Sequence, residues 1–210
     1  MNLDNSIYAI IDTEVLGNNL GIILKSLSKL LCYGVEIFQF RAKGLDDKDL
    51  IFFSRKMHRL IRAKKRIFII NDRCDIAILS KADGVHLGSC DIPAVDARKI
   101  LGPKSIIGKT IHSLKEYRIS KSEPLDYLSF GPVFKTETKP MLKLISRFAV
   151  KQITKTTKKT TFAIGGINQY NISSLSGTGI RNIALCRGIL DGKITKNNVL
   201  KLKKCLRNLS

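Results

Sequence analysis

Two acidic positions in the middle of the chain have surroundings that suit a metal or phosphate site. Asn71 and Asp72 follow directly after an apolar run, and Asp91 follows shortly after a second one, nineteen positions along from Asp72. That spacing suits the strand, helix and next strand of one parallel βαβ unit, which would bring both carboxylates to one sheet edge. Paired carboxylates beside an amide indicate Mg²⁺ with a phosphorylated ligand. The alternative is that these residues cap the following helices, which is the commoner role.

Apolar runs typical of buried strands alternate with amphipathic runs typical of helices along the whole chain. The eight expected strands are residues 6–12, 35–40, 66–70, 84–87, 105–109, 125–130, 160–164 and 180–185. The main expected helices are residues 20–31, 46–63, 74–80, 93–101, 114–120, 146–157 and 195–209, with a shorter one ending near residue 175. Strict alternation of strand and helix implies a parallel sheet covered by helices.

Eight such units in 210 residues favour an α/β fold of the (β/α)8 TIM-barrel type over an open sheet. No linker, repeat or low-complexity tract divides the chain, so we expect a single domain over residues 1–210. Barrels of this type place their active sites at the C-terminal ends of the strands. Most of the polar and glycine-containing stretches follow the expected strands directly, which predicts a site at that face.

Cations, hydroxyls and glycines fall at the other strand ends. Gln39, Arg41 and Lys43 alternate along one strand and can therefore share one face, where the cations suit a phosphate, although a solvated charged loop is the alternative. The remaining strand-end residues are Thr110 and His112, then Thr136, Thr138 and Lys139, then Gly165 and Gly166, and finally Cys186 and Arg187. A glycine pair before a helix lets the backbone approach a phosphate closely. The pattern predicts one carboxylate-rich and one glycine-rich end of a single anion-binding site.

The composition is strongly basic, with 37 Lys and Arg against 17 Asp and Glu, a net charge of +20. A basic surface can attract nucleic acid or anionic substrates, or can simply reflect a lysine-rich proteome. Aromatic residues are few and are not gathered with the basic ones, so we do not expect nucleic-acid binding. We expect small-molecule substrates, with a homo-oligomer as an open possibility.

The five cysteines are odd in number and scattered, and with the three histidines they show no zinc-ligand spacing. No run of eighteen apolar residues and no signal-peptide pattern is present, so we expect neither a membrane-spanning helix nor export. Reduced thiols then fit a cytoplasmic protein.

Taken together, the motifs resemble those of thiamine-phosphate synthases. They comprise residues 39–43 (Gln-Phe-Arg-Ala-Lys), 70–73 (Ile-Asn-Asp-Arg), 82–88 (Ala-Asp-Gly-Val-His-Leu-Gly) with Asp91, 131–139 (Gly-Pro-Val-Phe-Lys-Thr-Glu-Thr-Lys) and 164–167 (Ile-Gly-Gly-Ile). They occur in the order of that family and near its spacing, from about Tyr8 to Leu190. The resemblance implies condensation of a hydroxymethylpyrimidine diphosphate with a thiazole phosphate, giving thiamine phosphate and diphosphate.

The resemblance also implies roles for individual residues. Asp72 and Asp91 would bind Mg²⁺, and Gln39 would contact the pyrimidine. The diphosphate would be held by Arg41, Lys43, Asn71 and Lys139, with Thr110 standing where the family commonly has serine. The thiazole phosphate would be held by Thr136, Thr138, Gly166, Cys186 and Arg187. Phe40, Ala42 and Glu137 lie within the same substrate-binding motifs, and catalysis would rest on Arg41, Lys43, Thr110 and Lys139.

Two departures from the family pattern fall on the thiazole side of the expected site. Cys186 and Arg187 stand where the family usually has valine or isoleucine followed by serine, and the segment after Lys139 is about two residues short. The alternatives are a related thiazole tautomerase, in which His112 would be the catalytic candidate, and a non-catalytic regulatory or nucleic-acid-binding barrel. Those tautomerases tend to lose the metal carboxylates, whereas this chain keeps Asp72 and Asp91, which favours the synthase.

Overall fold

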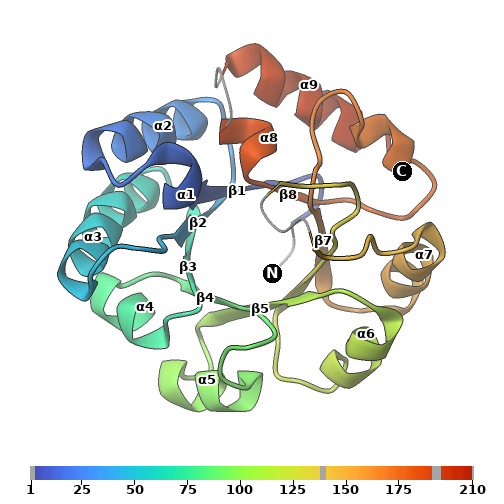
Figure 1. Cartoon of the computed structure of the whole chain (residues 1–210), viewed down its shortest axis with the longest axis horizontal. Coiled ribbons are helices and arrows are strands. Elements are labelled where there is room, and N and C mark those ends of the chain that lie inside the picture. The colour runs from blue at the N-terminus through green and yellow to red at the C-terminus, as the bar shows by residue number, and fades with distance from the viewer. Residues whose placement is uncertain (1–2, 138–140, 191–194, 210) are drawn as a thin grey trace.

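In the computed structural model, eight parallel strands close into a barrel (Figure 1). The structure describes residues 3–137, 141–190 and 195–209. The strands are β1 (Ile7–Asp12), β2 (Ile37–Arg41), β3 (Ile67–Asn71), β4 (Gly84–Leu87), β5 (Ile106–Ile111), β6 (Tyr127–Phe130), β7 (Thr160–Ile164) and β8 (Ile183–Leu185). Strand β8 pairs with β1, where Ile7 lies opposite Ile183 and closes the barrel. The predicted (β/α)8 fold is confirmed, and every predicted strand is present with its ends shifted by at most three residues.

Helices cover the outside of the barrel between successive strands (Figure 1). They are α1 (Thr13–Leu16), α2 (Leu20–Cys32), α3 (Asp47–Ala63), α4 (Cys74–Ser80), α5 (Ala94–Leu101), α6 (Leu114–Ser120), α7 (Arg147–Thr156), α8 (Arg187–Leu190) and α9 (Lys196–Arg207), with a 3-10 helix, η1 (Ile172–Leu175). The one-turn helix α1 was not predicted. Asp46 and Ser113 cap α3 and α6 as expected, each accepting a hydrogen bond from a first-turn backbone N–H.

The apolar residues form two layers. The larger one lies between the strands and the surrounding helices, and the smaller one fills the inside of the barrel. Inside the barrel, the rings of Tyr8, Tyr127 and Phe162 meet edge to face with centroids 5.3–5.9 Å apart. The barrel is therefore a packed core rather than a pore, and its buried tyrosine hydroxyls require hydrogen-bond partners.

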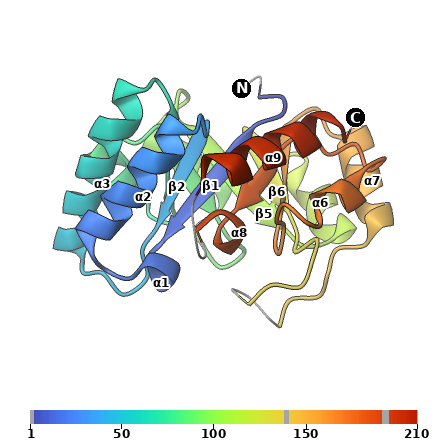
Figure 2. The same ribbon diagram turned by 90° about the horizontal axis from the view of Figure 1, so that it is seen from above.

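The two ends of the barrel differ. Figure 2 shows α1, α8 and the loop from β6 to α7 projecting beyond the strands at one end, with the N-terminus at the opposite end. The projecting segments follow the C-terminal ends of β1, β6 and β8, so they surround the face at which the site is expected.

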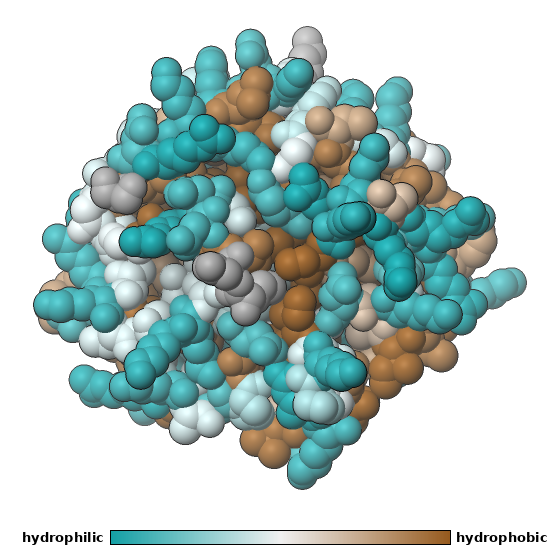
Figure 3. Space-filling model, turned by 180° about the vertical axis from the view of Figure 1, so that it is seen from behind, coloured by the Kyte–Doolittle hydropathy of each residue, from teal (hydrophilic) through white to brown (hydrophobic). Residues whose placement is uncertain are grey.

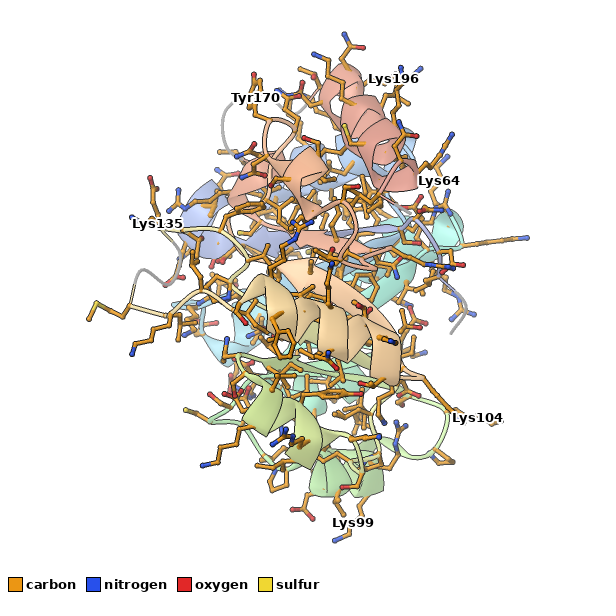
Figure 4. The ribbon with its side chains drawn as sticks, turned by 90° about the vertical axis from the view of Figure 1, so that its right-hand side faces the viewer. Lys64, Lys99, Lys104, Lys135, Tyr170 and Lys196 are labelled. Atoms are coloured by element: carbon orange, nitrogen blue, oxygen red, sulfur yellow. The ribbon has the colours of Figure 1, made fainter. Side chains whose placement is uncertain are left out.

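Charged side chains are spread over the molecule. The face at the N-terminal ends of the strands has apolar surface near its centre and hydrophilic residues around the rim (Figure 3). Lys99 and Lys196 point away from opposite sides, and Lys135 lies at the other end of the barrel from Lys64 and Lys104 (Figure 4). The positive charge is thus distributed around the barrel. Within the residues described, no helix is both long and apolar enough to cross a bilayer.

Candidate active site

A cavity of about 350 Å³ opens at the C-terminal end of the barrel, and every strand contributes to its lining. Most of the predicted site residues line it, as do His112 and Gly165. These predicted residues are Gln39, Arg41, Lys43, Asn71, Asp72, Asp91, Thr110, Thr136, Gly166, Cys186 and Arg187. Residues spread over 149 positions of sequence therefore meet in one cavity, because parallel strands end at the same face.

A few predicted residues lie elsewhere. Phe40 is 1% exposed and packs into the core between strands and helices, and Ala42 packs against the same core. Their neighbours Gln39, Arg41 and Lys43 face the cavity, as the two-residue period of a strand requires. The Glu137 side chain is largely exposed, and the predicted residues Thr138 and Lys139 lie outside the described part of the chain.

The two carboxylates predicted to bind metal face one another at the ends of β3 and β4. The Asp72 backbone N–H donates to the carbonyl oxygen of His86 at 2.8 Å, with Asp72 in the left-handed region at φ 64°. Asp91 Oδ2 accepts from the Gly88 N–H at 2.5 Å. Burial, and then a shared hydrogen bond and charge repulsion with Asp91, raise the pKa of Asp72 to about 6.

Neither carboxylate caps a helix. The N-cap positions of α4 and α5 are Arg73 and Pro93, and neither provides a side-chain capping bond. The capping interpretation of Asp72 and Asp91 is therefore wrong in this structure. Two facing carboxylates supply the oxygen donors that Mg²⁺ prefers. Among the residues described, no group of three or more His, Cys, Asp or Glu is placed to hold a metal ion, so an ion at these two carboxylates would need further ligands such as water or substrate oxygens.

Arg41 is held by two carboxylates that sequence reasoning did not assign to the site. Its Nη1 lies 2.6 Å from Oδ2 of Asp12 and 2.5 Å from Oε2 of Glu14. Burial lowers the pKa of Arg41, but the hydrogen bonds and charges of Glu14 and Asp12 outweigh it and raise the pKa overall. Asp12 is 1% exposed and is also the N-cap of α1, where its side chain accepts from the N–H of Glu14. In the sequence, Asp12 could have been recognised as a site residue because it is an acidic residue at the end of a predicted buried strand.

The floor of the cavity is polar although it lies inside the barrel. Gln39 donates to the Tyr8 hydroxyl, which bonds to the Tyr127 hydroxyl, and His86 bonds to both Tyr127 and Thr110. Tyr8, Tyr127 and His86 were not predicted as site residues. In the sequence, each of these residues could have been recognised as a polar side chain at an inward-facing position of an otherwise apolar strand.

His112 lines the cavity beside this floor. Its Nδ1 lies 2.6 Å from the carbonyl oxygen of Gly131, and its backbone N–H donates to the carboxylate of Glu116. The imidazole is thus fixed to the backbone at the end of β6.

The opposite side of the cavity is built from backbone. Gly165 and Gly166 have φ of 97° and 66°, and a Cβ on Gly166 would lie 2.3 Å from the carbonyl oxygen of Lys135. Only glycine allows this close approach between the ends of β6 and β7. The Asn171 amide donates to the Gly166 carbonyl and ties the loop to the start of η1.

Cys186 and Arg187 complete that side. Burial, and then the charge of Asp12, raise the pKa of the Cys186 thiol to about 12, so it stays protonated. Arg187 lines the cavity, and its Nε lies 3.8 Å from Oε2 of Glu137. A cation therefore faces the cavity at this departure from the family pattern.

The sequence matches a known protein family. The profile of the family described as thiamine monophosphate synthase matches residues 7–189. The chain belongs to this family. It is 37% identical over 200 residues to a thiamine-phosphate synthase of Prochlorococcus marinus subsp. pastoris, covering 95% of this chain and 55% of that protein. It is 34% identical to a thiamine-phosphate synthase of Persephonella marina, covering 99% of both chains.

A solved structure has the same fold. The thiamine phosphate pyrophosphorylase of Pyrococcus furiosus superimposes with a TM-score of 0.86 at 27% identity, covering 97% of this chain and 96% of that one. The chain spans about half the length of several curated relatives that it matches, and nearly the full length of others. Membership in the family and the superposition agree with the eight-stranded barrel.

Proposed function

We propose that this protein is a thiamine-phosphate synthase, a transferase that joins a hydroxymethylpyrimidine diphosphate to a thiazole phosphate and releases diphosphate. The observation that carries the proposal is one cavity whose two sides differ in chemistry, each suited to a phosphate group. Asp72 and Asp91, with Arg41 and Lys43 beside them, form one end, and the glycine backbone at Gly166 forms the other. Two phosphorylated small molecules could therefore bind with their reacting ends between the two sides.

The residues take the following parts in the proposal. Asp72 and Asp91 would hold Mg²⁺, which when bound supplies charge neutralisation for the diphosphate. Arg41, Lys43, Asn71 and Lys139 would hold the diphosphate, and Gln39 and Thr110 would contact the pyrimidine substrate. Thr136, Thr138, Gly166, Cys186 and Arg187 would hold the thiazole phosphate.

The reaction needs charge stabilisation and positioning more than proton transfer. The carbon–oxygen bond to the diphosphate breaks, and its electron pair leaves with the diphosphate, where Arg41 and Lys43 stabilise the charge that develops. The thiazole nitrogen then attacks the cationic pyrimidine carbon with its lone pair. Holding both substrates in one cavity makes that attack effectively unimolecular. The retention of both carboxylates supports the synthase over a tautomerase.

Turnover tests the proposal. Purified protein given both substrates and Mg²⁺ should form thiamine phosphate, and Asp91→Ala should abolish Mg²⁺-dependent turnover while the barrel stays folded. Asp75→Ala is the matched control, because that carboxylate binds Arg73 on the outside of α4 and should leave turnover unchanged. Full activity in Asp91→Ala would refute the metal role, and no product from folded wild type would refute the proposed reaction.

A further inference from the structure

A continuous chain of side-chain hydrogen bonds crosses the floor of the cavity. Gln39 Nε2 donates to the Tyr8 hydroxyl at 2.7 Å, and the hydroxyls of Tyr8 and Tyr127 lie 2.9 Å apart. The Tyr127 hydroxyl lies 2.8 Å from His86 Nδ1, and His86 Nε2 lies 2.7 Å from Thr110 Oγ1. Five strands contribute one residue each. The two ends, Gln39 and Thr110, are side chains that the proposed function places against the substrate.

The positions of the middle members are built into the barrel. The His86 and Tyr127 rings stack with centroids 5.6 Å apart and an angle of 25° between them. A Cβ on Gly108 would lie 1.9 Å from the Tyr127 ring, so β5 makes room for this phenol by having no side chain there. Tyr8 and Tyr127 are each 1% exposed, and His86 is 6% exposed. These groups have almost no access to water, so each hydrogen bond along the chain needs one donor and one acceptor.

The protons of a neutral chain can be arranged in two ways. In the first, Tyr8 donates to Tyr127, Tyr127 donates to His86 Nδ1, and His86 donates from Nε2 to Thr110. The Thr110 hydroxyl hydrogen is then directed to the cavity. In the second, every one of these bonds is reversed: Thr110 donates to His86 Nε2, His86 donates from Nδ1 to Tyr127, and Tyr127 donates to Tyr8. The Tyr8 oxygen then accepts from both Gln39 and Tyr127.

With the Gln39 amide nitrogen directed at Tyr8, burial decides between the two arrangements. The second leaves the hydroxyl hydrogen of Tyr8, a nearly inaccessible group, without an acceptor among the residues that the structure describes. The first uses every buried hydrogen within the chain and leaves Thr110, the more exposed end, as the open donor. An open donor at Thr110 also suits an anionic substrate, whose oxygen atoms are acceptors.

We propose that Tyr127 and His86 are positioning residues that order this chain from Gln39 toward Thr110. His86 is the Nε2–H tautomer, and Thr110 presents its hydroxyl hydrogen to an acceptor atom of the substrate. The amide NH₂ of Gln39 donates to Tyr8, so the amide oxygen of Gln39 is left to receive a donor group of the substrate. The identity of that substrate rests on the proposed function, whereas the proton order is a property of the protein alone.

Nitrogen NMR of protein labelled with ¹⁵N-histidine, without substrate, tests the proton order directly. The expected result for His86 is a protonated Nε2 and an unprotonated Nδ1, with its signals assigned by their loss in His86→Gln. The opposite tautomer, or a ring protonated at both nitrogens, would overturn the proposal. Tyr127→Phe keeps the ring but removes the donor to Nδ1, and should shift the His86 signals toward a mixture of tautomers.

A matched control uses another buried tyrosine. Tyr117 is 5% exposed and its hydroxyl bonds to Thr156 outside the barrel, so Tyr117→Phe should leave the His86 signals unchanged. An equal change of the His86 signals in both variants would show a general structural effect and would count against the proposed proton order.

Kinetics separate this proposal from the proposed reaction. Tyr127→Phe should lower kcat/KM for the pyrimidine diphosphate about tenfold, the effect of one lost hydrogen bond, and leave KM for the thiazole phosphate unchanged. An active wild type with the opposite His86 tautomer would refute the proposed proton order but not the proposed reaction. An inactive wild type with the expected tautomer would refute the proposed reaction but not the proton order. Should Tyr127→Phe fail to fold, the wild-type spectrum still decides the proton order.

Discussion

Asp72→Asn is predicted to stabilise the metal-free protein at about pH 8 and to have a much smaller effect on its stability at about pH 4. The folded-state pKa of Asp72, about 6, lies above its ordinary value of 3.8. Well below pH 3.8 the carboxyl is protonated in both states and does not affect the free energy of unfolding. As the pH rises from about 4 to about 6, the carboxyl ionises in the unfolded state before it does beside Asp91 in the folded state, so the free energy of unfolding falls over this range and stays lower above it. Asparagine removes this charge and tolerates the left-handed backbone at φ 64°.

The size of the effect follows from the change in pKa. A rise from 3.8 to about 6 corresponds to about 3 kcal/mol at 1.36 kcal/mol per tenfold change in the protonation constant. The carboxylate is only partly buried, so solvent screening reduces the expected gain to roughly 1–2 kcal/mol. In a chain of this length, that corresponds to a rise in Tm of about 2–8 °C.

Urea unfolding at the two pH values, with and without Mg²⁺, measures the effect. Mg²⁺ should stabilise the wild type at about pH 8 and have no effect on Asp72→Asn, since the ion loses one of its two carboxylates. Asp75→Asn is the control, for which the opposite sign is expected. The hydrogen bond from Arg73 lowers the pKa of Asp75, so loss of this carboxylate should destabilise the folded protein at the higher pH. Destabilisation by Asp72→Asn at about pH 8, or equal effects at both pH values, would refute the reasoning.

Three further substitutions test the groups around the two anion-binding ends. Glu14→Gln removes a half-exposed competitor for Arg41 and should tighten binding of inorganic diphosphate, measured by calorimetry, by up to about fivefold. Asp12→Asn breaks the buried pair with Arg41 and should lower the free energy of unfolding by about 3 kcal/mol in urea. Gly166→Ala should weaken binding of the thiazole phosphate at least about tenfold, because its Cβ would force the β6 and β7 ends apart. Gly44→Ala, at φ 86° with no atom within 4 Å, isolates backbone strain and should leave that affinity unchanged.

Each of these substitutions has a contrary outcome. Weaker diphosphate binding by Glu14→Gln would show that Glu14 supports the anion site instead of competing with it. An Asp12→Asn protein as stable as wild type would show that Arg41 does not depend on the buried carboxylate. Equal losses in Gly166→Ala and Gly44→Ala would assign the effect to strain rather than to the packing of the loop.

The barrel and most of the cavity lining could be predicted because both depend on local periodicity. Asp72 and Asp91 follow neighbouring parallel strands with a short helix between them, so nineteen positions of sequence were enough to bring them together. Gln39, Arg41 and Lys43 face the cavity for a similarly local reason, the alternation of side chains along β2. The capping hypothesis for Asp72 and Asp91 failed because the N-cap positions of the helices lie one and two residues beyond them.

The remaining features depend on closure of the barrel. Tyr8 and Tyr127 are 119 positions apart and meet only because β1 and β6 face one another across its interior. Helix α1 has a single turn, too short for a helical period to be recognised, so the approach of Glu14 to Arg41 could not be foreseen.

The central claim is that one cavity joins two phosphorylated substrates, and phosphorus NMR of a single reaction mixture tests it most directly. With the wild-type protein, Mg²⁺, the pyrimidine diphosphate and the thiazole phosphate, the signals of both substrates should decline together. Those of thiamine phosphate and free diphosphate should rise in equal amounts. Release of diphosphate without thiamine phosphate, or unchanged substrate signals in the presence of folded protein, would contradict the account.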